Sequence, residues 1–276
     1  MIKRLIFLGL LSIAVEADAI NDKILNLVGQ ESYDLHANLI NEILKDETPF
    51  ILNKNINYNN LLVALKKEEL INLIVNEQTE ITVSFSIKDN HKKGFKILKE
   101  VLANLGYSYY FTDFIKNTNG TLVWKIRFKA DSVLDPLALQ TELAKFSANL
   151  TDINKIDQTK WEYSIDAKNG ILNDIIRVIP NQKTPLQIPL QPYTLLLKDA
   201  TELIIASNKL NSWVPKISFY DNELNALGTI EMDRVYDGIK VSVPRNSKYA
   251  KIGDRYSLFN IKRGLVVTVS TIFRNN

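Results

Sequence analysis

The sequence contains no cysteine, which excludes disulfide frameworks, thiolate zinc sites, iron–sulfur clusters and cysteine nucleophiles. Histidine is almost as scarce: His36 and His91 are the only two, so one chain cannot build a three-histidine metal site. Glycine is also sparse, with 10 residues in 276, and no phosphate-binding loop, nucleophile elbow or paired-histidine zinc motif is present. These absences favour a protein that is not an enzyme and holds no cofactor or metal.

The chain also has no large excess of positive or negative charge. Lysine and arginine number 34 against 31 acidic residues, giving a net charge of +3, which argues against a general nucleic-acid binder. Hydrophobic residues make up 46% and charged residues 24%, the composition of an ordinary globular protein. The length suits one large domain or two to three small ones.

No apolar run is long enough to span a membrane. The longest, from Leu5 to Val15, is about half of the roughly 20 residues that a spanning helix needs. It follows two basic residues, and the small residues Ala17 and Ala19 stand where a signal peptidase requires them. This pattern predicts a cleavable export signal over residues 1–19, with a cut after Ala17 or a short buried helix as alternatives. We therefore expect a periplasmic protein without a transmembrane segment after signal removal.

Residues 20–78 show helical periodicity. Apolar residues recur at spacings of three and four, and Pro49 and the asparagine-rich stretch 53–60 interrupt them before a second amphipathic run over 61–75. Two helices alone bury little surface. We expect this helical segment to cap the next domain or to contact a partner.

Residues 79–168 predict a ferredoxin-like α+β domain with the order β-α-β-β-α-β. Apolar and polar residues alternate over 81–87, and Asn119-Gly120 is a strong hairpin signal. Its remaining predicted elements are a helix over 91–105, strands over 107–115 and 122–128, a helix from Pro136 to Ala148 and a strand over 161–165. A four-stranded sheet of this kind carries both helices on one face and leaves the small polar residues Thr82, Ser84 and Ser86 on the other.

Residues 169–192 contain four prolines and predict a linker. Residues 193–276 contain short strand-like runs between turn residues and predict an antiparallel β-sandwich. The expected fold class is therefore α+β: a helical segment, a ferredoxin-like domain and a C-terminal β-sandwich.

Aromatic residues of the last segment are the candidate contacts for a glycan or a partner protein. They would stack on sugar if exposed, although aromatic residues of a sandwich more often belong to its core. The candidates are Trp213, Tyr220, Tyr236, Tyr249 and Tyr256, with Phe259 beside them.

Carboxylates offer the remaining chemistry. Asp221 and Glu223 lie close in sequence, as do Glu231 and Asp233, and these four residues are the basis for a carboxylate-based hydrolase or a calcium site. Asp221 followed by Asn222 is equally typical of a hairpin turn. Either histidine is expected to be exposed or locally hydrogen-bonded.

Three stretches near the C-terminus carry a resemblance to known proteins: Trp213-Val214-Pro215, Lys248-Tyr249-Ala250-Lys251-Ile252-Gly253-Asp254 and Asn260-Ile261-Lys262-Arg263-Gly264. Together with the export signal and the abundance of Asn, Lys and Ile, they resemble periplasmic proteins of Campylobacter-type bacteria. Within that group the chain is similar to accessory scaffold proteins that build disks around the flagellar motor. The resemblance implies assembly with envelope proteins or with itself. A peptidoglycan-binding module and a hydrolase are the alternatives.

Overall fold

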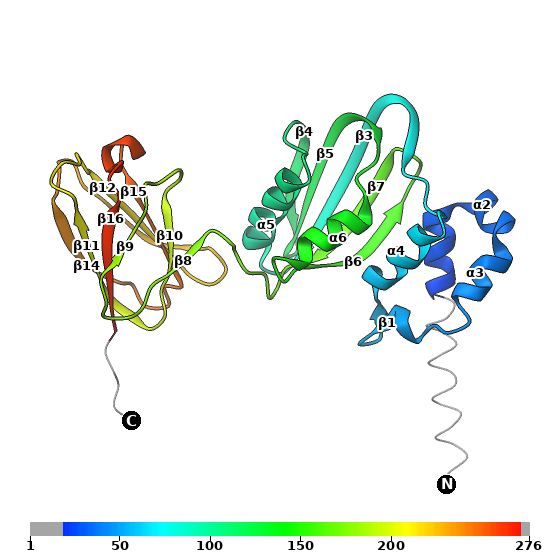
Figure 1. Ribbon diagram of the computed structural model, residues 1–276, viewed down its shortest axis with the longest axis horizontal. Helices are drawn as coiled ribbons and strands as arrows, with labels where there is room; N and C mark the ends of the chain where they lie inside the picture. Colours follow the sequence, from blue (N-terminus) through cyan, green and yellow to red (C-terminus); the bar gives the residue numbers. More distant parts are fainter. Residues whose placement is uncertain (1–18, 272–276) are drawn as a thin grey trace, which may run out of the picture. The chain divides into compact units, whose positions relative to one another are not determined.

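A computed structural model of the chain describes residues 19–271 (Figure 1). These residues form two compact units, the first ending at Ile171 and the second beginning at Leu172. Strands make up most of the regular structure, and all the α-helices of the described residues lie in unit 1, so the expected mixed α+β class is confirmed. Apart from Ala19, the predicted export signal lies outside the described residues.

Unit 1 begins with the helical segment. A helix over residues 19–28 is followed by α2 (Gln30–Leu35), α3 (Ala37–Ile43), the short 3₁₀ helix η1 (Thr48–Phe50), a small hairpin of β1 (Ile51–Leu52) and β2 (Asn55–Ile56), and α4 (Tyr58–Lys67). Pro49 and the asparagine-rich stretch interrupt the helices as expected. The helix expected over 61–75 corresponds to α4. It begins earlier because the Asn57 side chain caps it, and it ends earlier because the chain enters β3 at Ile74.

The remaining elements of unit 1 form a sheet with two helices. They are β3 (Ile74–Lys88), α5 (His91–Asn104), β4 (Phe111–Thr118), β5 (Thr121–Ser132), α6 (Pro136–Ala144), β6 (Asn149–Lys155) and β7 (Lys160–Asp166). Figure 1 shows α5 and α6 on one face of the sheet. The side chains of Phe85, Trp124 and Tyr163 lie opposite one another on neighbouring strands, with ring centroids 5.8 Å apart in both pairs that include Phe85. This buried aromatic row holds the three central strands together.

The expected four-stranded sheet is wrong in its last step. The sheet has five strands in the order β4-β5-β3-β7-β6, and β7 pairs with β3 in parallel. An extra strand, β6, follows α6 and takes the outer position, and the chain then turns back through Asp157 to place β7 beside β3. Sequence alternation identified β7 from Trp161, Tyr163 and Ile165. A strand around Ile153 is an open alternative in the sequence that would change this last step, and β6 takes that place; its bulge after Leu150 weakens the alternation.

Unit 2 consists of two sheets. One contains β8 (Ile175–Arg177), β10 (Tyr193–Leu196), β12 (Pro215–Tyr220), β13 (Ala226–Glu231) and β15 (Tyr249–Asp254), in the order β13-β12-β15-β10-β8. The other contains β9 (Thr184–Pro185), β11 (Ala200–Ser207), β14 (Gly238–Ser242) and β16 (Leu265–Thr271), in the order β14-β11-β16-β9. Buried residues of both sheets, among them Leu195, Leu203 and Ile217, form one hydrophobic core.

The stretch expected as a linker, 169–192, supplies an edge strand to each sheet of unit 2. β8 pairs in parallel with β10, and β9 pairs with β16. Leu186 is buried in the core. Prolines are tolerated here because edge strands need not donate every backbone N–H.

Candidate functional site

One edge of the unit 1 sheet is covered by the helical segment. The Asn26 side chain donates to the Lys155 carbonyl at 3.1 Å and accepts from the Lys155 N–H at 3.0 Å, so it bonds β6 as a neighbouring strand would. Lys23 donates to the Ile153 carbonyl at 2.8 Å and to the Asp152 carboxylate at 2.7 Å. Ile24, on the same helix, is fully buried. The β6 edge is therefore closed to other strands.

Tyr58 of α4 adds to this cover. Its hydroxyl donates to the Asp152 carboxylate at 2.8 Å. Burial of the ring, and then this hydrogen bond, raise the pKa of Tyr58 well above its usual range. The phenol therefore stays neutral and keeps donating at any physiological pH.

The opposite edge, β4, is exposed along its whole length. Phe111, Phe114 and Ile115 are exposed large hydrophobic residues on this strand. A bulge at Asp113 interrupts its pairing with β5, and residues 114–118 then pair regularly with 125–121. Edge strands of this kind present unpaired backbone groups that another strand can bond. Exposed apolar side chains add affinity to such a contact.

Arg127 anchors the bulge from β5. Its guanidinium bonds Asp113 at 2.7 Å and Glu80 at 2.9 Å, and it lies over the Phe111 ring at 5.4 Å. The hydrogen bond that Arg127 donates to Asp113, followed by the one that it donates to Glu80, raises the pKa of Arg127. These contacts fix the first half of β4 and leave residues 114–118 as its regular, unpartnered part.

Unit 2 gathers four connections at one end, which we call the loop end (Figure 1, upper end of the unit drawn in yellow to red). Strand register places them together, because Pro215 is paired with Asp254, Ser207 with Leu265 and Ala206 with Gly238. The four loops span residues 186–192, 208–214, 232–237 and 255–264. Each one joins the two sheets.

Short side chains hold these loops in shape. The Asp254 carboxylate accepts hydrogen bonds from the backbone N–H groups of Tyr256 and Ser257 and from the Asn260 amide, all within 3.0 Å. The Asn211 amide donates to the Gly264 carbonyl at 3.0 Å and accepts from the Arg263 N–H at 3.2 Å. Backbone groups of Tyr256, Ser257, Arg263 and Gly264 are thus bonded within the protein.

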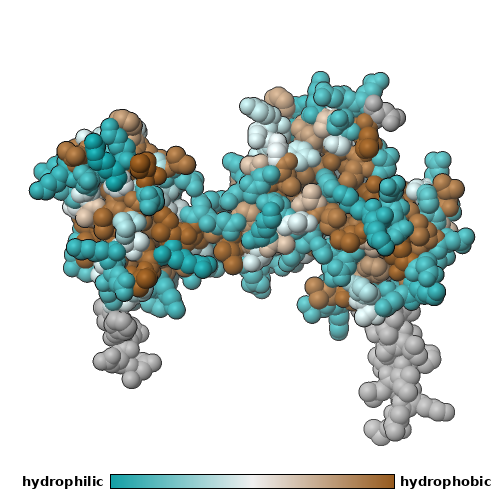
Figure 2. Space-filling model, viewed as in Figure 1, coloured by the Kyte–Doolittle hydropathy of each residue, from teal (hydrophilic) through white to brown (hydrophobic). Residues whose placement is uncertain are grey.

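Every one of the four loops exposes at least one large hydrophobic side chain. The exposed fractions are 67% for Ile188, 98% for Leu190, 71% for Leu210, 54% for Val235, 68% for Tyr256 and 69% for Phe259. In the far-end loops of the same unit (178–183, 197–199, 221–225 and 243–248), the described large hydrophobic residues include a single exposed one, Ile179. Figure 2 shows hydrophobic and hydrophilic atoms alternating over the loop end.

Cations accompany the rings of the loop end. Lys262 lies 4.1 Å from the Phe259 ring centroid, Arg255 lies 5.6 Å from Tyr256, and Arg234 lies 5.4 Å from Tyr236. The four loops contain five basic and two acidic residues. This end is therefore both apolar and positively charged.

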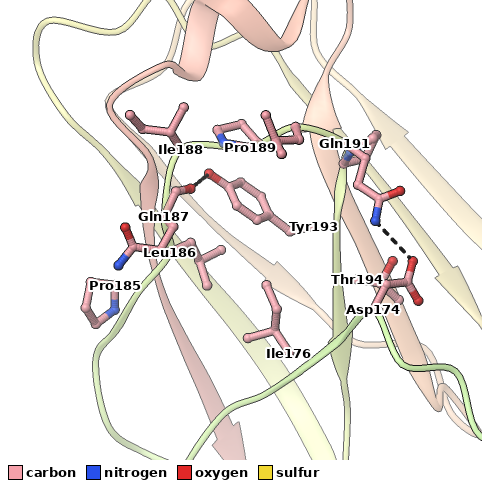
Figure 3. A pocket seen from close by; sticks show the side chains of 12 residues that line it. Asp174, Ile176, Pro185, Leu186, Gln187, Ile188, Pro189, Gln191, Tyr193 and Thr194 are labelled. Carbon is pink, nitrogen blue, oxygen red and sulfur yellow. Dashed lines mark hydrogen bonds between the residues drawn. The ribbon is translucent and has the colours of Figure 1, made fainter. Parts of the chain in front are cut away.

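A hollow of about 380 Å³ opens beside the first of these loops. Figure 3 shows the Tyr193 ring at its centre, between Ile188 and Ile176, with its hydroxyl donating to the Gln187 carbonyl at 2.5 Å. Burial raises the pKa of Tyr193 to about 12. The only charged group in the lining is Asp174, which accepts from Gln191 at 3.4 Å. The hollow offers mainly apolar surface.

The five predicted aromatic contacts do not form one platform. Trp213 is fully buried, and its indole N–H donates to the Gly253 carbonyl at 2.9 Å. Tyr236 and Tyr256 belong to the loop end, where only Tyr256 is fully exposed. Tyr220 and Tyr249 are paired with each other at the far end of β12 and β15. Of the exposed loop-end residues, the sequence analysis missed Ile188 and Leu190, because their prolines suggested a linker. The uncharged run 186–192 is the signal that could have found them.

The candidate carboxylates form two pairs at opposite ends of β13, with Asp221 and Glu223 before the strand and Glu231 and Asp233 at its end. Asp221 closes the β12–β13 hairpin at the far end by accepting from the N–H groups of Glu223 and Asn225. Glu231 lies at the other end of β13, where a hydrogen bond from Lys216 lowers the pKa of its carboxyl. Asp221 therefore forms the turn that its sequence suggested.

Both histidines have hydrogen-bond contacts, His36 locally and His91 with Asn117 of β4. His36 Nδ1 lies 2.8 Å from the Ser32 carbonyl, and His91 Nε2 lies 3.2 Å from the Asn117 amide nitrogen. Over residues 19–271, no three His, Asp or Glu residues gather closely enough to hold a metal ion.

Comparisons with known proteins add nothing to this geometry. No family model, curated protein or solved structure matches the chain. Among the described residues, no helix combines the length and the apolar character needed to cross a membrane. The surfaces themselves are therefore the basis for a function: an open sheet edge in unit 1 and a loop end in unit 2.

Proposed function

We propose that this protein is a non-enzymatic scaffold or adaptor of the periplasm that assembles with other envelope proteins. The observation that carries the proposal is the open edge at β4. The same sheet has a second edge, at β6, which the chain closes with its own side chains. An edge left open beside exposed Phe114 and Ile115 is suited to accept a strand from another protein.

The site of contact is residues 114–118. Their register with β5 is regular, so an added strand would continue the sheet without meeting the bulge at Asp113. Main-chain hydrogen bonds would supply affinity, and Phe114 with Lys116 would supply selectivity from one face. An extended strand of an envelope protein is the proposed occupant.

In-cell crosslinking at native expression tests the proposal. We expect the unaltered protein to be recovered in crosslinked species that Phe114→Lys abolishes, because lysine on an edge strand discourages strand addition. Val63→Lys is the matched control, since Val63 is an exposed apolar residue on α4. Recovery of monomer only, or equal loss in both variants, overturns the proposal. A crosslink between two copies would make the partner a second copy of this chain.

The domain types belong to the same proposal. The first half of the unit 1 sheet supports a ferredoxin-like pattern. Its elements follow the order β3, α5, β4, β5, and β5 lies between β3 and β4 in the sheet. Two sheets around one core support a β-sandwich for unit 2. Both are small modules of the kind that assembly proteins combine.

Assembly around the flagellar motor is proposed from the resemblance of the sequence alone. Deletion of the gene followed by a motility assay and imaging of the envelope tests it. Loss of a periplasmic structure at the motor supports this location. Normal motility and normal envelope images remove the motor from the proposal and leave the β4 contact to be judged by crosslinking.

A further inference from the structure

We propose that the loop end of unit 2 binds the surface of an anionic phospholipid membrane. This inference goes beyond the proposed function and involves the other unit. Six exposed large hydrophobic residues, distributed over four loops, form the apolar part of this surface. They gather at one end of the unit, interspersed with polar residues (Figure 2), whereas the far-end loops have one such residue, Ile179.

The side chains favour a membrane because of how they are arranged. Leu190, Leu210 and Phe259 stand out singly from different loops, each at least two-thirds exposed. Single projecting side chains of this kind can enter the boundary between headgroups and acyl chains.

The cations favour an anionic surface. Two exposed rings have a positive charge beside them: Lys262 lies over Phe259, and Arg255 lies over Tyr256. Aromatic and basic side chains are combined in this way at membrane interfaces. With five basic and two acidic residues in the four loops, anionic headgroups would be attracted. The far-end loops contain four basic and three acidic residues with one exposed large hydrophobic residue, Ile179, so both features are weaker there.

The loop backbones satisfy a second requirement of an apolar environment. Polar groups that approach lipid without a partner are costly, so they must be bonded within the protein. Asp254 bonds the N–H groups of Tyr256 and Ser257, and Ser257 in turn caps Phe259. Asn208 bonds the N–H of Leu210, and Arg263 bonds its carbonyl at 2.8 Å. The backbone at Leu210, Tyr256 and Phe259 can therefore enter the interface with these groups bonded.

Sedimentation with vesicles tests the proposal on protein purified from the soluble fraction of the expressing cells. We expect binding to vesicles that contain phosphatidylglycerol, weaker binding at high salt, and little binding to pure phosphatidylcholine. Leu190→Glu combined with Phe259→Glu should lower the fraction bound at least tenfold. Replacing Arg255 and Lys262 by Gln should lower affinity about fivefold for each charge removed.

Ile179→Glu is the matched control, since it places the same charge at the far end of the same unit. Near-ultraviolet circular dichroism verifies that each variant keeps its fold. The proposal is overturned if neither vesicle is bound, if the loop-end variants bind like the control, or if phosphatidylcholine is bound equally well. It is also overturned if the loop-end variants lose a protein or peptidoglycan contact while vesicle binding is absent.

Discussion

The two edges of the unit 1 sheet differ in what covers them. At β6 the chain supplies its own cover, with Asn26 bonding both backbone groups of Lys155. At β4 the strand is exposed from Phe111 to Thr118. The difference shows that this sequence contains the means to close an edge and uses them at one edge only. The proposed partner strand would occupy the edge that the chain leaves open.

Truncating a buried side chain of the helix that covers β6 should have the largest effect on the stability of unit 1. Leu27 is fully buried on the helix that lies along β6. Leu27→Ala should lower the free energy of unfolding of unit 1 by about 2–5 kcal/mol, through lost burial and a residual cavity. Chemical denaturation measures this, with exposed Leu35→Ala as the control. Equal effects of the two variants would show that the helix is not part of the fold.

Removing the side-chain amide that bonds β6 in the way a neighbouring strand does should have the next largest effect on stability. Asn26→Ala leaves the Lys155 N–H and carbonyl without their partner, at a cost of about 1–3 kcal/mol. We expect the Lys155 amide to exchange hydrogen as fast as the amides of β4, measured by NMR. Asn59→Ala, at an exposed asparagine of α4, controls for composition. Unchanged protection at Lys155 would show that Asn26 is not what closes the β6 edge.

The contribution of Tyr58 to the stability of the covered β6 edge depends on pH. Because its pKa is raised in the folded state, its contribution is present below its ordinary value of 10.0 and is lost as pH rises above that value. Tyr58→Phe should cost about 0.5–1.5 kcal/mol at neutral pH and reduce the alkaline loss of stability. Unfolding measured from pH 8 to 11 tests this, with exposed Tyr109→Phe as control. An identical pH profile in both variants contradicts the prediction.

Change at the open edge should have the smallest effect on stability. Phe114→Lys exposes no cavity and breaks no described hydrogen bond, so we expect the free energy of unfolding to change by less than about 0.5 kcal/mol. Denaturation of the purified protein provides the measurement. A loss as large as that of Asn26→Ala would show that Phe114 stabilises the fold and would remove the distinction between the edges.

Local sequence signals predicted much of this architecture. Alternation found β3 and β7, Asn119-Gly120 marked the β4–β5 turn, and Pro136 marked the start of α6. These signals are local, and the structure follows them. The hydrogen bonds between Asn26 and Lys155 could not be predicted, because an asparagine in a helical pattern does not indicate which distant strand it will contact.

The surfaces were less predictable than the elements. Trp213 and Tyr256 are both aromatic residues of unit 2, yet one is buried and the other exposed. The path of the connections decides this, and it depends on which strands are neighbours. For the same reason the proline-rich run around Leu190 suggested a linker, whereas strand pairing on both sides of it makes it a loop of the folded unit.

The cover of β6 also sets an order of events during synthesis. The helix that contains Asn26 leaves the ribosome first, and its strand follows 129 residues later. At about 5–20 residues per second, the helix waits roughly 6–26 s for its partner. Closing so long a loop is slow compared with forming the β4–β5 hairpin. Until then the β6 edge remains available to other chains, so the time that this helix spends unpaired sets how long misassembly at that edge is possible.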